Sequence, residues 1–287
     1  MRGSLASQDR LRAFALLSPA YLWLTVAVFL PLSAMAFFSF LTDVPFGGRD
    51  WHLSFANYRA FVETGTYAAL LWKSLKLGAI VTGVSVVVGF PCAYVLAKVI
   101  RGRSREALFL LVILPFWSNS LVRIFSWAIV LRGNGVLDRA VNAILPWDVK
   151  LNLMFSPTAI VIGLVHSYLP YVILTSYLAI QAIDDSLIDA ARSLGARRRT
   201  ILWRLVLPLA SPGIIAGAVL IFVPVVGSFM EPRLLGGRLG TYYGTVIEDQ
   251  FVAVFNWPLG AALSFILLAV VLVILGAASP VLRRAWI

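Results

Sequence analysis

The residue types that most often carry out enzyme chemistry are few and scattered in this sequence. The two histidines, His52 and His166, lie more than a hundred residues apart and form no metal-ligand pattern with cysteine or carboxylate neighbours. The single cysteine, Cys92, lies inside an apolar run, which excludes an internal disulfide. None of the four lysines follows a glycine, so a Walker A loop is absent, and no Gly-x-Ser-x-Gly motif occurs. We therefore expect a chain that is not an enzyme and binds no metal or cofactor.

A second set of residues places polar or aromatic groups within otherwise apolar stretches. Such groups at membrane depth usually face the interior of a helix bundle, and the ring faces of Trp and Tyr attract cations. Eight residues are accordingly candidates for contact with a solute: Trp117, Asn119, Ser120, Arg123, Tyr168, Tyr171, Ser228 and Glu231. The alternative is an interfacial aromatic belt with hydrogen bonds between helices.

Composition indicates the elements that must position these groups. Of 287 residues, 60% are hydrophobic and only 13% are charged, whereas soluble domains have about 25% charged residues. A membrane-crossing helix needs about 20 mostly apolar residues, and the sequence holds enough such stretches for an all-α protein with six spans. The predicted spans are 14–41, 74–98, 107–131, 157–181, 208–230 and 259–282.

The basic residues predict the orientation of these spans. The net charge of +11 would suggest nucleic-acid binding in a soluble protein, but in a membrane protein Lys and Arg mark the cytoplasmic loops. Fourteen of the 24 lie at the two termini and in the second and fourth loops, nine lie in the other loops, and Arg123 lies within a span. Both termini are therefore predicted to be cytoplasmic, and no nucleic-acid partner is expected.

The first span has a competing interpretation. Basic residues precede an apolar run that reaches Ala34-Met35-Ala36, which could be a signal peptide with its cleavage site. The run of about 30 residues is longer than a signal peptide's apolar core of 7–15 residues, and Pro31 lies just before the site. We therefore expect a retained span.

The fourth loop, 182–208, is the most informative segment of the chain. Ser186 to Asp189 fits a capping box that starts a short helix. Its expected apolar face consists of Ile183, Leu187, Ala190, Ala191 and Leu194. Gly195 is expected to end the helix, Arg197–Arg199 follow, and a second short amphipathic segment leads to Pro208. Such a helix–Gly–helix segment cannot cross a bilayer, so it either presents an apolar face to a partner protein or lies on lipid headgroups.

This loop resembles the EAA loop of bacterial ABC importer permeases. The family pattern is Glu-Ala-Ala, three residues, Gly, nine residues, Ile, one residue, Leu-Pro; here Asp189 replaces Glu and Leu205 replaces Ile. The matching residues are Asp189, Ala190, Ala191, Gly195, Ala196, Leu205, Leu207 and Pro208. The resemblance implies the type I importer fold, with a coupling helix in this loop that docks on an ATP-binding subunit.

Other segments resemble the first permease subunit of spermidine/putrescine importers. They are 115–123, 212–217, 235–237 and 256–262. This resemblance implies an inner-membrane importer with a homologous second permease, two ATP-binding subunits that use ATP and Mg, an extracytoplasmic solute-binding protein, and surrounding lipid. The chain departs from the family after Gly227, where Ser228, Glu231 and Arg233 stand in a segment that is often more acidic. An opine, another amino-containing solute or a small anion therefore remain alternatives to a polyamine.

Two other classes of function fit less well. A secondary transporter would place ionisable groups near the middle of its spans and contain inverted repeats, whereas these spans are nearly free of charge. A membrane-embedded enzyme would need a reactive cluster that the sequence lacks.

A Gly213-x3-Gly217 pattern indicates either close helix packing or chance in an apolar helix.

Overall fold

The computed structural model describes the backbone of residues 2–44, 50–144 and 151–285, with side chains over the same ranges except at 2–13, 15 and 279–285. These ranges are helical over nearly their whole length. Their only β-pairing is an isolated bridge between Leu41 and Leu53. The prediction of an all-α protein is therefore confirmed.

The α-helices are α1 (Arg2–Ser39), α2 (Ala56–Thr64), α3 (Thr66–Tyr94), α4 (Arg103–Ile113), α5 (Ser120–Leu131), α6 (Val136–Ile144), α7 (Pro157–Gln181), α8 (Asp185–Ser193), α9 (Arg198–Ile201), α10 (Leu207–Val226), α11 (Met230–Gly236), α12 (Tyr243–Val252) and α13 (Trp257–Ala285). Two π-helical segments, η1 (Val95–Val99) and η3 (Leu202–Val206), and two 3₁₀ segments, η2 (Leu114–Trp117) and η4 (Gly237–Leu239), continue or link them. The chain forms two compact units, residues 1–64 with 249–266 and residues 65–248 with 267–287.

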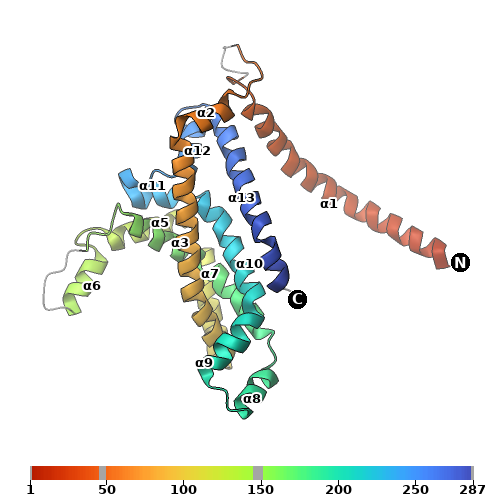
Figure 1. Cartoon of the computed structure of the whole chain (residues 1–287), viewed down its shortest axis with the longest axis vertical. Coiled ribbons are helices and arrows are strands. Elements are labelled where there is room, and N and C mark those ends of the chain that lie inside the picture. Colours follow the sequence, from red (N-terminus) through yellow and green to blue (C-terminus); the bar gives the residue numbers. More distant parts are fainter. Residues whose placement is uncertain (1, 45–49, 145–150, 286–287) are drawn as a thin grey trace. The chain divides into compact units, whose positions relative to one another are not determined.

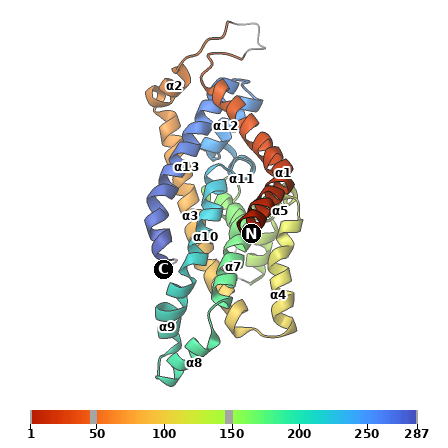
Figure 2. The same cartoon turned by 90° about the vertical axis from the view of Figure 1, so that its right-hand side faces the viewer.

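The larger unit is built around three long helices. α3, α7 and α10 run side by side, with α8 and α9 at one end of the group (Figures 1 and 2). Gly213 and Gly217 of α10 lie directly against α7, where an added Cβ would overlap Ala179 or Thr175. The close-packing interpretation of these glycines is confirmed, because only a residue without a side chain fits there.

Two apolar clusters lie within this unit. One joins α3, η1, α7, α8, α9, η3 and α10 next to the 182–208 loop, and includes Ile183, Ile188, Ile201 and Val206. The other joins α3, α5, α7, α10 and α11, and includes Ile124, Leu164 and Leu235. The described helices therefore have one packed region beside the loop and another beside the candidate solute residues.

Five helical stretches are long and apolar enough to cross a membrane. They are Leu16–Ser39, Thr66–Val99, Pro157–Gln181, Arg198–Val226 and Trp257–Ala278. A sixth crossing is made only if Arg103–Trp117 and Ser120–Leu131, which are bent by 99°, count together. The predicted single span 107–131 therefore consists of two helices with a sharp bend between them.

The break between these helices has local causes. Pro115 lacks an N–H and so cannot continue the α4 ladder, and Asn119 caps α5 by accepting a 2.8 Å hydrogen bond from the N–H of Leu121. The Pro115 carbonyl accepts from the Ser118 hydroxyl at 2.8 Å and from Arg123 Nη1 at 2.8 Å. The Pro115 carbonyl also accepts a 3.3 Å bond from the Ser118 N–H, so Arg123 is one of three donors that gather on this carbonyl at the bend.

In the smaller unit, the chain folds back after α1. The Asn57 amide donates to the carbonyls of Ser39 and Leu41 at 3.1 and 2.8 Å. The Phe40 ring lies 5.3 Å from both Phe55 and Tyr58. These contacts hold α2 against the end of α1 within this unit.

Several residues behind the orientation prediction fall outside the described part of the chain. Arg49 and Lys150 are not described, and neither are the side chains of Arg2, Arg10, Arg12, Arg283 and Arg284. The cytoplasmic location of the termini stays a prediction.

Candidate functional site

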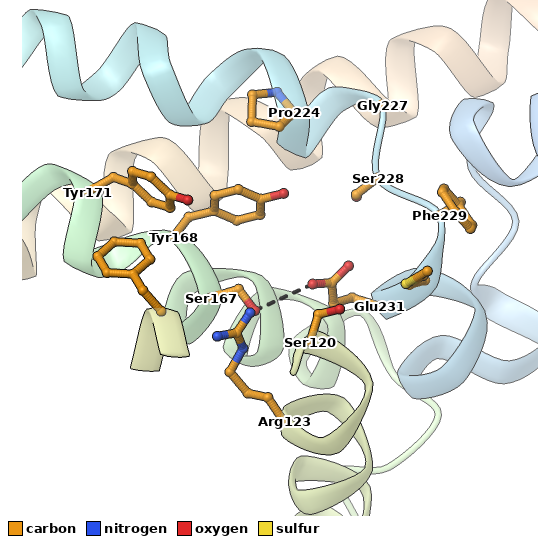
Figure 3. Close-up of a pocket in the computed structure, with 12 residues that line it drawn as sticks. Ser120, Arg123, Ser167, Tyr168, Tyr171, Pro224, Gly227, Ser228, Phe229 and Glu231 are labelled. Carbon is orange, nitrogen blue, oxygen red and sulfur yellow. Dashed lines mark hydrogen bonds between the residues drawn. The ribbon is translucent and has the colours of Figure 1, made fainter. Parts of the chain in front are cut away.

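A polar cavity of about 360 Å³ lies in the larger unit, within the size range of small-molecule sites. It is formed by η2, α5, α7, the end of α10 and the start of α11 (Figure 3). Its lining residues are Phe116, Ser120, Arg123, Ser167, Tyr168, Tyr171, Pro224, Gly227, Ser228, Phe229, Met230 and Glu231.

The fold brings six of the eight candidate solute residues to this cavity, although they come from three separate parts of the chain. They are Ser120, Arg123, Tyr168, Tyr171, Ser228 and Glu231. The bend between α4 and α5 places the first turn of α5 beside α7, and Gly227 ends α10 so that the chain turns toward α11. Their contact with a solute stays a prediction, but their proximity is a property of the structure.

The other two candidates do not line the cavity. The Trp117 side chain is 90% exposed, and Asn119 caps α5. Because both lie in the break between α4 and α5, the helical spacing assumed from sequence does not apply to them. The interfacial-belt alternative suits Trp117 better than a cavity role does.

Several lining residues were not anticipated from the sequence. Ser167 precedes Tyr168 and lies one turn before Tyr171, so helical spacing from Tyr171 could have identified it. Phe116 contacts Tyr171 edge to face, with ring centroids 4.5 Å apart. Phe229 follows Ser228 in the non-helical link between α10 and α11, where no periodic pattern could reveal its direction.

The charged groups of the cavity are unequally satisfied. Glu231 is only 8% exposed, and its carboxylate accepts a long 3.4 Å hydrogen bond from the Ser167 hydroxyl. The Ser228 hydroxyl is buried without a hydrogen-bond partner among the described residues. Arg123 donates from Nη1 to the Pro115 carbonyl at 2.8 Å, while its buried Nε has no hydrogen-bond partner among the described residues. The carboxylate is thus the charged group of the cavity with the weaker internal partner.

The second arginine of the sequence analysis, Arg233, lies outside this lining. Its guanidinium pairs with Glu248 at 2.5 Å and donates to the Thr245 carbonyl at 3.4 Å. Its positive charge is therefore offset by a carboxylate of α12 and does not make the cavity more basic.

The 182–208 loop forms two short helices separated by Gly195, as expected. Gly195 has a φ of +79°, a left-handed conformation that favours glycine. The helix, however, begins earlier than the predicted capping box: Asp184 is the N-cap and accepts from the Ser186 N–H at 2.8 Å. That hydrogen bond lowers the pKa of the Asp184 carboxyl.

The predicted apolar face of α8 is also partly wrong. Ile183 and Ile188 are buried, while Leu187 is half exposed and Leu194 is 89% exposed. Ala191 packs against the core beside Ile188. Of the predicted face, Ile183 and Ala191 therefore pack, while Leu187, Ala190 and Leu194 do not, and Ile188 is the buried residue of α8 that the prediction missed.

The remaining motif residues lie at the junction of the loop and the bundle. Ala196, Leu205 and Leu207 are partly buried against the apolar cluster. Ala190 and Pro208 are exposed, and exposed Asp189 pairs with Arg192 at 2.9 Å. The motif thus combines positions that seat the loop on its own bundle with positions that stay on the surface.

Lys98, at the end of η1, ties α8 to α3. Its ammonium group donates to the Ile183 carbonyl at 2.6 Å and to Asp185 Oδ1 at 2.7 Å, with the lysine side chain only 10% exposed. The hydrogen bond from Lys98 lowers the pKa of the Asp185 carboxyl. This role of Lys98 could not be predicted from the sequence, because its partners lie more than 80 residues away along the chain.

Comparison with known proteins places this geometry in context. Residues 85–284 match the family model described as "Binding-protein-dependent transport system inner membrane component". The chain is 37% identical over 271 residues to the spermidine/putrescine transport system permease protein PotB of Escherichia coli, covering 91% of this chain and 96% of that protein. It is 34% identical over 265 residues to PotB of Haemophilus influenzae, covering 91% and 92%. A solved bacterial ABC transporter involved in the import of alginate has the same fold, with a TM-score of 0.75, 18% identity and 99% of both chains covered.

Proposed function

The chain belongs to the family of binding-protein-dependent transport system inner membrane components, and from this premise we propose that it is the permease subunit of a polyamine importer. It is a multi-pass inner-membrane subunit and not the catalytic component. The solute class we propose is spermidine or putrescine. The observation that carries this choice is the 37% identity to PotB across nearly the full length of both chains.

The cavity chemistry agrees with an amine as the solute. A buried carboxylate, three serine hydroxyl groups and two tyrosine rings line one space, and a cationic amine can interact with all three kinds of group. We propose that this cavity is part of the path that the solute takes through the chain, with Ser120, Arg123, Tyr168, Tyr171, Ser228 and Glu231 along it.

We further propose that the 182–208 loop couples the path to a partner ATPase. Two ATP-binding subunits would use ATP and Mg, and their closure would move α8 and with it the helices to which α8 is attached. The attachment consists of the Lys98 hydrogen bonds and the burial of Ile188. A homologous second permease would complete the path, and both termini would lie in the cytoplasm with a solute-binding protein on the opposite side. ATP would then favour one of two bundle arrangements, which is alternating access.

A solute that carries both an ammonium and a carboxylate group is the second candidate, because Arg123 lines the same cavity as Glu231. Opines and other amino-containing solutes belong to this class.

The test is reconstitution of the full transporter with its partner subunits and solute-binding protein in proteoliposomes. Uptake of putrescine or spermidine, with ATP hydrolysis stimulated by the loaded binding protein, supports the proposed function. Uptake of an amino acid-like solute alone would instead favour the second candidate. Transport by the isolated chain would contradict a role as one subunit of an ATP-driven importer.

A further inference from the structure

Glu231 is a buried acid that forms no direct ion pair with a described residue, although Arg123 lines the same cavity. It is 8% exposed, and its carboxylate accepts a long hydrogen bond of 3.4 Å from the Ser167 hydroxyl. A buried carboxylate that is not directly ion-paired is costly. Three other acids, Asp185, Asp189 and Glu248, do form ion pairs with Lys or Arg side chains. Glu231 is therefore placed to receive a cation from outside the chain.

Its surroundings supply further acceptors for such a cation. Ser228 is only 9% exposed, and its hydroxyl has no hydrogen-bond partner in the described part of the chain. In Figure 3 the Glu231 carboxylate and the Tyr168 hydroxyl point into the same space near Ser228. The Tyr168 and Tyr171 rings, with centroids 6.1 Å apart, form the aromatic side of this space.

The chemistry of these groups fits a primary ammonium group. An ammonium group has three N–H donors, and the carboxylate, the serine hydroxyl and the tyrosine hydroxyl are three acceptors. Aromatic rings add attraction for an organic cation. A divalent metal ion fits less well, since Ca²⁺ takes about six to eight oxygen ligands and favours carboxylates, whereas this lining holds one carboxylate.

Arg123 limits the number of cations that this cavity can accept. Its guanidinium lines the same cavity and is held by the Pro115 carbonyl at 2.8 Å, so its positive charge faces any cation that enters. The fixed guanidinium offsets the charge of the single carboxylate, so this cavity accepts no more than one ammonium group.

We propose that Glu231, Ser228 and Tyr168 form a subsite for one terminal ammonium group of the transported solute. This inference rests on the proposed function, because it assumes that the cavity belongs to the solute path. The remaining length of a polyamine, with its other charges, lies beyond this cavity.

The test compares Glu231→Gln with wild type in the assembled transporter. Gln keeps the size and one acceptor oxygen of Glu but removes the charge, so we expect binding of radiolabelled putrescine to the purified complex, and its uptake, to fall about tenfold or more. Glu231→Asp keeps the charge and should retain a substantial part of both. Ser228→Ala should weaken binding severalfold. Glu106→Gln, which removes an exposed acid of α4 outside the cavity, is the matched control and should leave both unchanged.

The outcomes separate the inference from the proposed function. Size-exclusion chromatography first establishes that each variant assembles. If Glu231→Gln does not assemble, putrescine binding by Glu231→Asp, which keeps the charge, is compared with wild type instead. The ammonium subsite is overturned if wild type takes up putrescine and Glu231→Gln takes it up equally well. It is also overturned if Glu231→Gln and Glu231→Asp lose uptake equally. In both cases polyamine import by the wild type stands. Wild type that takes up 4-aminobutyrate but no polyamine overturns the polyamine assignment, and in that case a tenfold loss of 4-aminobutyrate uptake in Glu231→Gln still supports the subsite.

Discussion

The acids of the 182–208 loop and the acid of the polar cavity have opposite environments. In the loop, Asp184, Asp185 and Asp189 are exposed, and each is satisfied by a group of the same chain: the Ser186 N–H, Lys98 and Arg192. In the cavity, Glu231 is buried, and its carboxylate accepts only a long hydrogen bond, from the Ser167 hydroxyl, among the described side chains.

This difference indicates that the loop is recognised mainly by its shape and the cavity mainly by its charge. Exposed ion pairs contribute little free energy because water screens them, so the loop acids mainly fix the start and path of α8. The loop leaves Leu187 and Leu194 exposed, beside the exposed basic run Arg197–Arg199. The cavity leaves a charge unsatisfied. A protein surface therefore complements the first region and a small cation the second.

The largest effect in the loop should come from Gly195→Val. Gly195 has open space around it but a φ of +79°, so the penalty is in the backbone and not in a clash. A left-handed conformation costs a residue with a side chain about 1–2 kcal/mol, which is about 5- to 30-fold in population. We expect uptake per ATP hydrolysed to fall by such a factor, measured in proteoliposomes. The control is Gly83→Ala, because Gly83 lies in open space on α3 without a positive φ. Normal coupling in Gly195→Val would show that coupling does not depend on the shape of the loop.

The next largest effect should come from Lys98→Met, which removes the tie between α3 and α8. A hydrogen bond from a charged donor contributes about 1.5–3 kcal/mol, and the bond to the Ile183 carbonyl is the part-buried one. We expect severalfold less uptake per ATP, with the complex still assembled. Asp185→Asn, which leaves that carbonyl bond in place, should have a smaller effect. Equal loss in both variants would mean that the exposed ion pair, and not the buried bond, carries the connection.

The same pair predicts a flat pH response near neutrality. The pKa of Asp185 is lowered by Lys98, so the pair is stabilising above the ordinary pKa of an aspartate, about 3.9, and is lost only as the pH falls through the lower, folded-state value. Between about pH 6 and 8, the difference in uptake per ATP between wild type and Asp185→Asn should therefore stay constant. A difference that disappears within this range would assign it to another titrating group.

A smaller effect of opposite sign is expected in the cavity from Arg123→Met. Removing the guanidinium removes its repulsion of an ammonium group, so putrescine binding to the assembled transporter should tighten by a few fold. Arg123→Lys keeps the charge and should bind as wild type does. Weaker binding in Arg123→Met alone would indicate that the hydrogen bond to Pro115 is needed to shape the cavity, and the contrast with Glu231 would then rest on geometry.

Sequence identified the loop better than it identified the cavity, for reasons visible in particular residues. Gly195 and the motif around it are contiguous, and a glycine that ends a helix has a local cause. The start of α8 was misplaced because Asp184 and Ser186 are both good caps and only the fold selects between them. The cavity depends on the bend at Pro115, and prolines are tolerated within membrane helices, so its presence did not predict a break. Without that break, Trp117 could not be separated from the residues that line the cavity.

The smallest effect should come from Asp189→Asn. The carboxylate is exposed and pairs with exposed Arg192 three residues along the same helix, a kind of pair that contributes little to stability. Because Ile188 and the Lys98 bonds hold α8 without it, the thermal unfolding temperature should be unchanged and uptake should stay within about twofold of wild type. If uptake instead falls tenfold in a complex that still assembles, the carboxylate contacts the ATPase directly, and the loop then offers charge as well as shape.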